Sequence, residues 1–400
     1  MITLSQARAQ LQRLKARLET ENIPIAKALG RVASSDTTSS LAIPPADNSA
    51  MDGFAIRVSD LNDQHNTLPI SQRIPAGIGP EPLVAGTAAR IFTGGVMPIG
   101  ADAVVIQENC DYDHLSVTVL KKTVTSGANV RPKGQDISYG AKVISKGQKL
   151  SAIDISLLAS IGQASIAVYK PLKVALFSTG DELVEPGQDL KAGQIYNSNR
   201  PLLIALCEQM GFLPYDCGIV EDTLEATKLA LMDAAKNADV IVSSGGVSVG
   251  EEDHVRPAVE ALGELELWKV QMKPGKPVAF GNVAGVPFLG LPGNPVSSFT
   301  VFQLLGVPLL TSLQGQRETE QITYPVSAAF SKSISSREEY IRVKIERDAD
   351  GELHANRFPN LSSGVMSSLS WADGLVRQDI DSAIEVGQKL AFLPLRNAML

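Results

Sequence analysis

The sequence predicts a multidomain protein that combines an α/β domain, built on a mostly parallel sheet, with further β-rich regions. Three observations support this prediction. The chain has 400 residues, more than one ordinary hydrophobic core holds, since domains typically take about 100–200 residues. Residues 171–314 alternate apolar strand-like runs with amphipathic helical stretches. Residues 41–140 and 318–400 instead carry short strand-like runs separated by turns.

Composition excludes several classes of protein. The formal net charge of -7 argues against nonspecific nucleic-acid binding, which requires a basic surface. The three cysteines form no CxxC pair and the four histidines are scattered, so neither a disulfide framework nor a zinc site is expected. The first residues lack the apolar core of a signal peptide, and the apolar run at 297–313 is interrupted by Gln303 and Pro308. We therefore expect a reduced, cytoplasmic protein without a membrane span.

The N-terminal segment predicts a helix over residues 3–20. Thr3 and Gln6 have the spacing of a capping box. An apolar stripe at helical spacing follows it, made of Ala7, Leu11, Leu14 and Leu18. The stripe is too short for a self-sufficient coiled coil, so we expect it to pack on another domain or on a second subunit.

The next regions change character. Residues 41–140 are rich in proline, glycine and short β-type runs, which predicts an all-β module with long loops. Residues 141–170 are mixed, and "SAIDISLLASIG" within them predicts a helix. At the other end of the chain, residues 318–400 lose the helical period and predict a small β-barrel or a sandwich.

Residues 171–314 predict βαβ units. "LKVALFS", "LPYDCGIV" and "DVIVSS" are strands, while residues 197–211 and 222–238 are helices that begin at capping residues. Asp222 or Thr223 caps the second helix, and Gly211 ends the first. Because ligands bind at the carboxyl ends of strands in such sheets, the polar segments "STGDE", "VEDT" and "SSGGVSVGEED" indicate one site.

The segment "SSGGVSVGEEDHV", residues 243–255, has two interpretations. Gly245, Gly246 and Gly250 allow a close approach of the backbone to an anion. Asp253 is either an N-cap of the next helix or a ligand of a cation, and three carboxylates in a row exceed what capping requires. Oxygen ligands of this kind are those that Mg²⁺ prefers.

Other segments are similarly ambiguous. Glu182 belongs either to a polar turn or to the site, and "GQIYNSNR" places Asn197, Ser198 and Arg200 at a helix start, where a phosphate or ribose binds. The constrained loop "KPGKP" favours an anion-binding role for Lys273 and Lys276 over two solvated lysines.

Three further loops are open in the same way. "GLPGNPVSSF" carries Gly293 and Asn294, which either present backbone groups to a ligand or form a capped turn. Asp52 and Asp136 lie in polar, proline-bearing loops for which the residues alone give no mechanism.

The chain has no P-loop, no GxGxxG between a strand and a helix, and no GxSxG.

Taken together, the motifs resemble one family. "PPADNSAMDGFA", "IFTGG", "RPKGQD", "FSTGDEL", "IYNSN", "SSGGVSVGEED", "KPGKP" and "LPGNPVSS" occur in this order. The chain resembles the MoeA-type molybdopterin molybdenumtransferases, which are related to the E domain of gephyrin. The resemblance covers nearly the whole sequence and implies four domains. These are a composite elongated N-terminal domain (1–40 and 141–170), a β-rich insert (41–140), an α/β molybdopterin-binding domain (171–317) and a C-terminal β-barrel (318–400).

The resemblance also implies a reaction. Adenylated molybdopterin is cleaved at its pyrophosphate with support from Mg²⁺, molybdate is inserted at the dithiolene, and AMP leaves. A homodimer is implied, with each active site shared between the α/β domain of one subunit and the β-rich insert of the other. An upstream adenylyltransferase would supply the substrate, and molybdoenzymes would receive the product.

Individual residues acquire roles by the same resemblance. Glu182, Asp222 and Asp253 match acidic catalytic positions and are the expected metal ligands, and Asp52 and Asp136 are further catalytic candidates from the partner subunit. The expected substrate-binding residues are Thr93, Ser178, Thr179, Asn197, Ser198, Gly245, Gly246, Ser248, Lys269, Lys273, Lys276, Gly293, Asn294, Arg342 and Ser367. Among these, Thr93 would also come from the partner, whereas Arg342 and Ser367 match positions associated with molybdate.

Two other functions compete with this one. A scaffold or binding protein with the same fold is the first, although a scaffold could dispense with the charged site. A molybdopterin adenylyltransferase is the second, although that activity belongs to an isolated α/β domain and the flanking domains argue against it.

Overall fold

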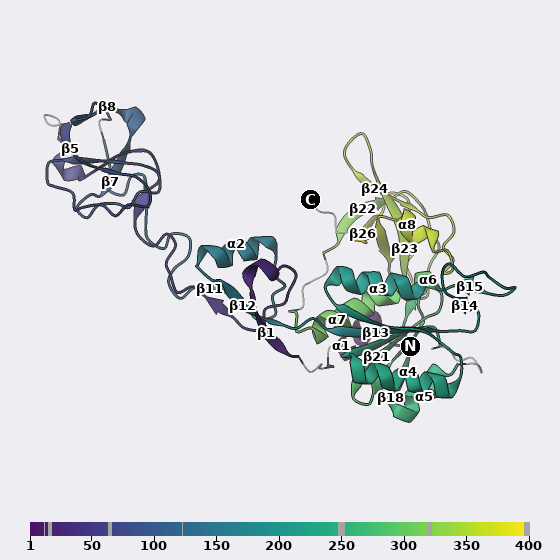
Figure 1. Cartoon of the computed structure of the whole chain (residues 1–400). Helices are drawn as coiled ribbons and strands as arrows, with labels where there is room; N and C mark the ends of the chain where they lie inside the picture. Colours follow the sequence, from purple (N-terminus) through teal and green to yellow (C-terminus); the bar gives the residue numbers. More distant parts are fainter. Residues whose placement is uncertain are drawn as a thin grey trace.

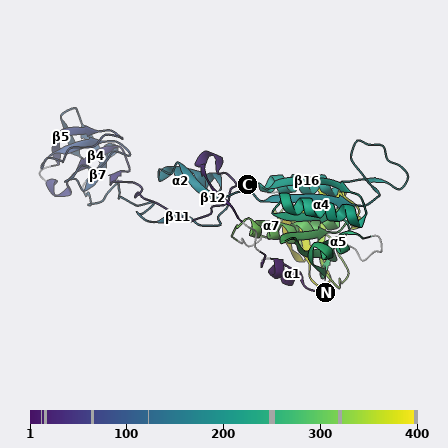
Figure 2. The same cartoon turned by 60° about the horizontal axis from the view of Figure 1, so that its bottom comes forward.

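The computed structural model describes residues 1–11, 13–14, 18–62, 66–121, 123–246, 253–317 and 322–395. In both views the chain is elongated, with a β-rich module at one end, a small mixed module in the middle and a large α/β and β body at the other end (Figures 1 and 2). This is the multidomain α/β plus β architecture that the sequence predicts. The domain limits given above remain predictions, and the sheets below are described by their own residues.

The large body is built around a six-stranded sheet with the strand order β16-β13-β17-β21-β20-β18. Strands β16, β13, β17 and β21 are parallel to one another, β20 runs antiparallel to β21, and the edge strand β18 runs antiparallel to β20 and therefore in the direction of the parallel strands. The strands are β16 (Leu213–Val220), β13 (Lys173–Thr179), β17 (Val240–Ser244), β21 (Val286–Leu291), β20 (Pro277–Val283) and β18 (Gly263–Lys269). The three strands predicted from "LKVALFS", "LPYDCGIV" and "DVIVSS" are confirmed.

Helices cover both faces of this sheet (Figure 2). Alternate residues of β13 belong to two different cores: Val174 and Leu176 to one, Ala175 and Phe177 to the other. The first core includes residues of α1 (Leu4–Leu11), α3 (Asn199–Met210), α6 (Pro295–Val301) and α7 (Val307–Leu313). The second includes residues of α4 (Leu224–Asn237) and α5 (Val255–Leu262). The sheet is therefore a buried layer, and its ends are where a ligand could reach it.

Local signals in the sequence account for several helix ends. Thr3 and Gln6 exchange the two hydrogen bonds of the predicted capping box, at 2.9 and 3.2 Å. The buried Leu4, Ala7 and Leu11 then pack with residues of the α/β core, which is the docking on another domain that the apolar stripe predicts, but the predicted extent of the helix is wrong, because α1 ends at Leu11 and Thr20 already begins a strand. At the end of α3, Gly211 adopts φ +87°, a left-handed conformation that glycine favours.

The segment Pro295–Leu313, which joins α6 and α7 through a π-helical turn at Phe302–Gly306, is long and apolar enough to span a membrane. However, 72% of its apolar window is buried inside the protein. It packs against the sheet in the first core, as a core helix does.

The middle module is assembled from two separate pieces of chain. Strand β1 (Thr20–Pro24) pairs with β12 (Ser165–Tyr169), and β2 (Thr37–Thr38) pairs with β11 (Lys142–Ile144). The helix predicted after residue 150 is α2 (Ala152–Ser160), which begins with a capping box between Ser151 and Asp154. Because the chain leaves this module after β2 and returns at β11, the β-rich module is an insertion.

The inserted module contains a six-stranded sheet with the order β7-β4-β6-β5-β9-β8. Its strands are β7 (Ala103–Ile106), β4 (Gly53–Ile56), β6 (Ala88–Ile91), β5 (Thr67–Ile74), β9 (Ser116–Val119) and β8 (Cys110–Tyr112). A short pair, β3 (Asn48–Ser49) and β10 (Val130–Arg131), lies where the chain enters and leaves it. The all-β prediction for this region is confirmed.

The C-terminal region forms a closed barrel, which decides between the two predicted alternatives. Its strands follow the order β23-β24-β22-β26-β25, and β25 pairs back with β23. They are β22 (Tyr324–Ala328), β23 (Glu338–Arg347), β24 (Leu353–Arg357), β25 (Gly374–Gln378) and β26 (Lys389–Pro394), with α8 (Ser367–Trp371) between β24 and β25. Strand β19 (Met272–Lys273), from the α/β body, pairs in parallel with the first residues of β23, Glu338 and Glu339.

Candidate functional site

The parallel strands of the α/β sheet end in a cluster of buried polar side chains. The Ser178 and Ser244 hydroxyls, at the ends of β13 and β17, lie 2.7 Å apart, and Ser178 also donates to Asn197 Oδ1 at 3.4 Å. All three side chains are at most 2% exposed. Among the residues that the structure describes, none accepts a hydrogen bond from the amide Nδ2 of Asn197. A buried donor without a partner is costly, so it is well placed to receive a hydrogen bond acceptor of a ligand.

Glycines bring the backbone of the neighbouring loop against this cluster. Gly246 has φ +68°, and a Cβ there would lie 2.3 Å from Val255 Cγ2 and 2.7 Å from Thr179 Oγ1. A Cβ on Gly245, at φ +89°, would lie 2.9 Å from the Thr179 carbonyl oxygen. Only glycine fits both positions without displacing a neighbour. The loop therefore needs glycine because it packs closely against Thr179 and Val255, whereas the predicted approach of its backbone to an anion stays a prediction.

The three predicted acidic residues lie in segments that come after the carboxyl ends of β13, β16 and β17. Glu182 is exposed after β13, and its carboxylate folds back beside Gly180. Asp222 is half-buried two residues after β16, which pairs with β13. Asp253 is half-buried two residues before α5, and the capping position of that helix is His254. All three segments thus belong to one edge of the sheet, and Asp253 is not the N-cap.

The acidic side chains at this edge can be compared with the ligands that the predicted Mg²⁺ requires. Within the described ranges no three histidine, cysteine, aspartate or glutamate side chains cluster closely enough to hold a metal ion. Ser248, Gly250, Glu251 and Glu252 lie outside the described residues. Mg²⁺ commonly uses one or two protein carboxylates and completes its coordination with substrate phosphates and water. Single carboxylates along this edge fit a Mg²⁺ that arrives with a phosphate ligand, and not a protein cage.

Arg200, in the segment "NSNR", has a structural role and not the predicted ligand-binding role. Arg200 is only 8% exposed and forms ion pairs with Glu185 and Asp216, so the expectation that it faces a phosphate or ribose is wrong. Its guanidinium instead ties α3 to β16 and to the loop after the short strand β14 (Leu183–Val184). Ser198 occupies the N-cap position of α3 without a side-chain capping bond.

Asn199, which the sequence interpretation did not single out, donates from Nδ2 to the Gly293 carbonyl oxygen at 2.7 Å. Gly293 and Asn294 follow β21 and are exposed. Asn294 is the N-cap of α6, yet its side chain makes no capping hydrogen bond. The interpretation of Asn294 as a side-chain cap of this turn is therefore wrong.

The sequence interpretation also missed Ser244, although its position directly before the glycine pair was a usable signal.

The basic loop lies at the same edge of the sheet. Strand β20 begins at Pro277 and runs antiparallel to β21, so the loop before it meets the carboxyl end of β21. Lys269 and Lys276 are exposed, and Lys273 is half-exposed with its ammonium 3.3 Å from Glu339 Oε2 of the barrel. These positive charges can offset the negative charge of a bound anion.

Three motifs of the inserted module also meet one another. Gly94 donates to the Ser49 carbonyl oxygen at 2.8 Å, and Gly134 donates to that of Pro44 at 2.9 Å. Thr93 donates from its backbone N–H and its hydroxyl to Asp52 Oδ1, both at 2.7 Å. These two hydrogen bonds hold the pKa of Asp52 below its ordinary value. Asp136 is exposed on the third motif.

This second cluster is well separated from the α/β sheet of the same chain (Figures 1 and 2). Within one chain, the sheet of the inserted module therefore does not reach the edge of the α/β sheet to which Glu182, Asp222 and Asp253 belong.

The two predicted barrel residues have different surroundings. Arg342, on β23, is 1% exposed and donates to the carbonyl oxygens of Asn360 and Ser362 at 3.1 and 3.3 Å. Burial lowers the pKa of Arg342, and its Nε has no hydrogen-bond partner within the described part of the chain. Ser367 is exposed at the start of α8. The loop after β24 contacts the start of α6, next to the candidate site, because the backbone N–H of Val296 donates to the Ser363 carbonyl oxygen.

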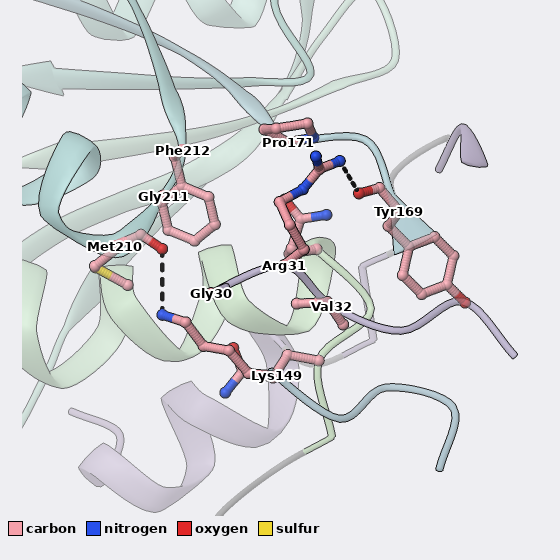
Figure 3. A pocket seen from close by; sticks show the side chains of 11 residues that line it. Gly30, Arg31, Val32, Lys149, Tyr169, Pro171, Met210, Gly211 and Phe212 are labelled. Carbon is pink, nitrogen blue, oxygen red and sulfur yellow. Dashed lines mark hydrogen bonds between the residues drawn. The ribbon is translucent and has the colours of Figure 1, made fainter. Parts of the chain in front are cut away.

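A pocket lies at the opposite edge of the sheet (Figure 3). It is lined by residues that precede β13 and β16, among them Pro171 and Phe212, and by Arg31 and Lys149 of the middle module. Lys149 Nζ donates to the Met210 carbonyl oxygen at 3.3 Å, and Arg31 donates to that of Tyr169 at 2.8 Å. Its cavity volume of about 10 Å³ holds roughly one water molecule. It is a seam between two modules and has no room for a nucleotide.

Comparison with known proteins agrees with this geometry. Three family models match successive parts of the chain: the MoeA N-terminal region (domain I and II) at residues 2–162, a probable molybdopterin binding domain at 175–312, and the MoeA C-terminal region (domain IV) at 327–395. The molybdopterin molybdenumtransferase of Haemophilus influenzae is 40% identical over 321 residues, which cover 80% of this chain and 79% of that protein. This chain belongs to the MoeA-type molybdopterin molybdenumtransferase family.

Two further comparisons support the membership. The gephyrin of Dictyostelium discoideum is 32% identical over 378 residues, covering 82% of this chain and 53% of that protein. The crystal structure of a molybdopterin biosynthesis MoeA protein from Pyrococcus horikoshii superimposes with a TM-score of 0.84 at 32% identity, over 99% of this chain and 100% of that one. The MoeA family architecture therefore extends over the whole described chain, including the inserted module and the barrel.

Proposed function

We propose that this MoeA family member inserts molybdate into adenylated molybdopterin, with cleavage of the pyrophosphate and release of AMP. The observation that carries the proposal is the edge of the α/β sheet. There a buried hydroxyl and amide cluster around Ser178 and Asn197, a glycine loop at Gly245 and Gly246, and the basic loop at Lys273 come from separate parts of the chain. The relatives named molybdopterin molybdenumtransferase make this substrate the first to test.

Each part of this edge has a chemical task in the proposal. Backbone N–H groups of the glycine loop and the Asn197 amide hold phosphate oxygens of the substrate. Lys269, Lys273 and Lys276 offset the charge of the diphosphate. Asp253, Asp222 and Glu182 accept a proton from, or orient, the water that attacks phosphorus. When bound, Mg²⁺ would neutralise developing charge on the phosphate oxygens, held by one or two of these carboxylates.

The inserted module takes part as a second half of the site. Asp52 and Thr93 are fixed to each other next to β4 and β6 of the inserted module, which lies far from the α/β body of its own chain (Figure 1). A homodimer in which the insert of one subunit covers the sheet edge of the other would use both clusters, and we propose that arrangement. The substrate would come from an adenylyltransferase and the product would pass to molybdoenzymes in the cytoplasm.

One experiment tests the proposal directly. The purified protein is incubated with adenylated molybdopterin and Mg²⁺, and AMP is measured with and without molybdate. We expect AMP release that depends on molybdate concentration. Binding of the substrate without turnover at any molybdate concentration would contradict the enzymatic proposal and support a binding protein with the same fold.

A further inference from the structure

Glu339 is a carboxylate in an unusual position. It lies on barrel strand β23, and its side chain is 4% exposed. Its Oε2 is 2.8 Å from the Lys332 ammonium and 3.3 Å from the Lys273 ammonium. Burial of a carboxylate is expensive unless cations compensate it, so the two lysines explain why the charge is tolerated. Nothing in the reaction proposed above uses this carboxylate.

The two lysines come from different domains and differ in exposure. Lys332 belongs to the barrel, its side chain is 13% exposed, and its backbone is fixed by two hydrogen bonds with Ile384, at 2.9 and 2.8 Å. Lys273 belongs to the basic loop of the α/β body, and its side chain is 44% exposed. Glu339 therefore joins a fixed, buried ammonium to one that faces solvent at the candidate site.

The backbone around Lys273 is held by the same barrel strand. Met272 and Lys273 pair in parallel with Glu338 and Glu339. Glu338 donates from its backbone N–H to the Gln271 carbonyl oxygen at 3.1 Å, and Arg337 donates to that of Met272 at 3.1 Å. The start of the basic loop is thus part of the barrel's hydrogen-bonded edge, and the position of Lys273 depends on β23.

From this geometry we infer that Glu339 is a positioning residue, which holds the Lys273 ammonium toward the phosphate-bearing part of the substrate from inside the barrel. The inference rests on the proposed function for the identity of the substrate. A lysine side chain has four rotatable bonds and a single point charge, so its direction is fixed only by its partners. An anion that binds Lys273 would share the ammonium with Glu339, whose second cation, Lys332, keeps the carboxylate in place.

Removing the negative charge of Glu339 has two separate effects on the binding of an anion. In Glu339→Gln the side-chain shape is kept, and the local positive charge increases because neither lysine is altered. Long-range attraction of an anionic substrate is therefore kept or strengthened, whereas the direction of the Lys273 ammonium is lost. A misplaced binding group lowers the rate of the chemical step, by up to about 10²-fold for an error of 1 Å.

The test compares kinetic constants for molybdate-dependent AMP release in three variants. For Glu339→Gln we expect kcat to fall roughly tenfold or more while KM for adenylated molybdopterin changes by less than about threefold. Glu339→Asp keeps the charge and should recover part of kcat. Glu352→Gln is the matched control, since Glu352 pairs with Lys389 in the same barrel but both side chains are more than half exposed. The control should have wild-type constants.

A double variant decides whether Glu339 acts through Lys273. In a Lys273→Met background, adding Glu339→Gln should lower kcat by less than about twofold, because the group that it positions is already absent. An unchanged kcat in Glu339→Gln would overturn the inference. So would an equal loss in both backgrounds, which indicates that Glu339 only stabilises the barrel.

A binding measurement keeps the inference testable if the proposed reaction fails. Inorganic pyrophosphate with Mg²⁺ is titrated into the wild type, Glu339→Gln and Lys273→Met by calorimetry. No AMP release by the wild type would refute the proposed function alone. A less favourable pyrophosphate binding enthalpy in both variants, with the affinity of Glu339→Gln kept by its added positive charge, would still support positioning of Lys273, whereas a changed enthalpy in Lys273→Met only would overturn it.

Should Glu339→Gln fail to fold, the double variant Lys332→Met/Glu339→Gln removes both buried charges. Low kcat with normal hydrogen exchange in the barrel strands is the outcome that supports the inference, and wild-type kcat is the outcome that overturns it.

Discussion

Substitution of Gly246 by alanine is the most specific perturbation of the glycine loop. The residue has φ +68°, and the added Cβ would meet Val255 Cγ2 at 2.3 Å and Thr179 Oγ1 at 2.7 Å. A left-handed alanine costs about 1–2 kcal/mol by itself. Displacing packed neighbours adds typically 1–3 kcal/mol. The substitution should therefore destabilise this region by about 2–5 kcal/mol, and it should push apart the ends of β13 and α5.

Gly193→Ala is the matched control for backbone strain. Gly193 has φ +85° and lies in the same domain, but a Cβ there would meet no atom within 4 Å. It should therefore show the strain of a left-handed alanine, about 1–2 kcal/mol, without the steric part. The difference between the two variants, about 1–3 kcal/mol, measures the close approach at Gly246.

The assay is native-state hydrogen exchange of the amides of β17 and α5. It reports local opening, which suits a chain of several domains better than one global unfolding transition. We expect faster exchange in these elements for Gly246→Ala than for Gly193→Ala, together with loss of AMP release in Gly246→Ala only. Equal exchange rates and equal activities in the two variants would refute the account of the glycine loop.

Three further predictions concern single side chains. Asp253→Asn should keep wild-type hydrogen exchange in α5, because the cap position is His254, and should lower kcat by roughly 10²-fold; wild-type turnover would remove Asp253 from the chemistry. Thr93→Ala keeps the backbone hydrogen bond to Asp52 but removes the hydroxyl bond, so it should raise the pKa of Asp52 part of the way toward its ordinary value in an NMR titration, and stability that the wild type loses only as pH falls through the depressed pKa should be lost at higher pH; an unchanged pKa would show that the Thr93 hydroxyl does not contribute. Asn294→Ala should change the free energy of unfolding by less than the ~1 kcal/mol of a usual capping residue, yet weaken substrate binding in calorimetry; the reverse pattern would make Asn294 a cap.

Local interactions explain why much of the α/β domain could be predicted from sequence. The capping box at Thr3 and Gln6 and the helix end at Gly211 depend on residues within one turn of each other. The strands next to polar loops show an apolar run that stops abruptly at Thr179 or Ser244. Because parallel strands end at one edge, the order of these motifs also predicts that Glu182, Asp222 and Asp253 belong to the same edge.

Long-range pairing explains what the sequence alone could not provide. Arg200 looks like a phosphate ligand at a helix start, but Asp216 and Glu185, 16 and 15 residues away, bury it. No local pattern relates Glu339 to Lys273, because their contact depends on the pairing of β19 with a strand of another domain. The choice between barrel and sandwich depended likewise on the pairing of β23 with β25.

The central claim is that the substrate binds at the carboxyl edge of the α/β sheet. Hydrogen exchange with and without adenylated molybdopterin tests it most directly. The account predicts slower exchange with substrate in residues 178–182, 197–199, 244–246 and 293–295, all of which border that edge. Protection confined to the seam around Arg31, Lys149 and Met210, with none in these four segments, would contradict it.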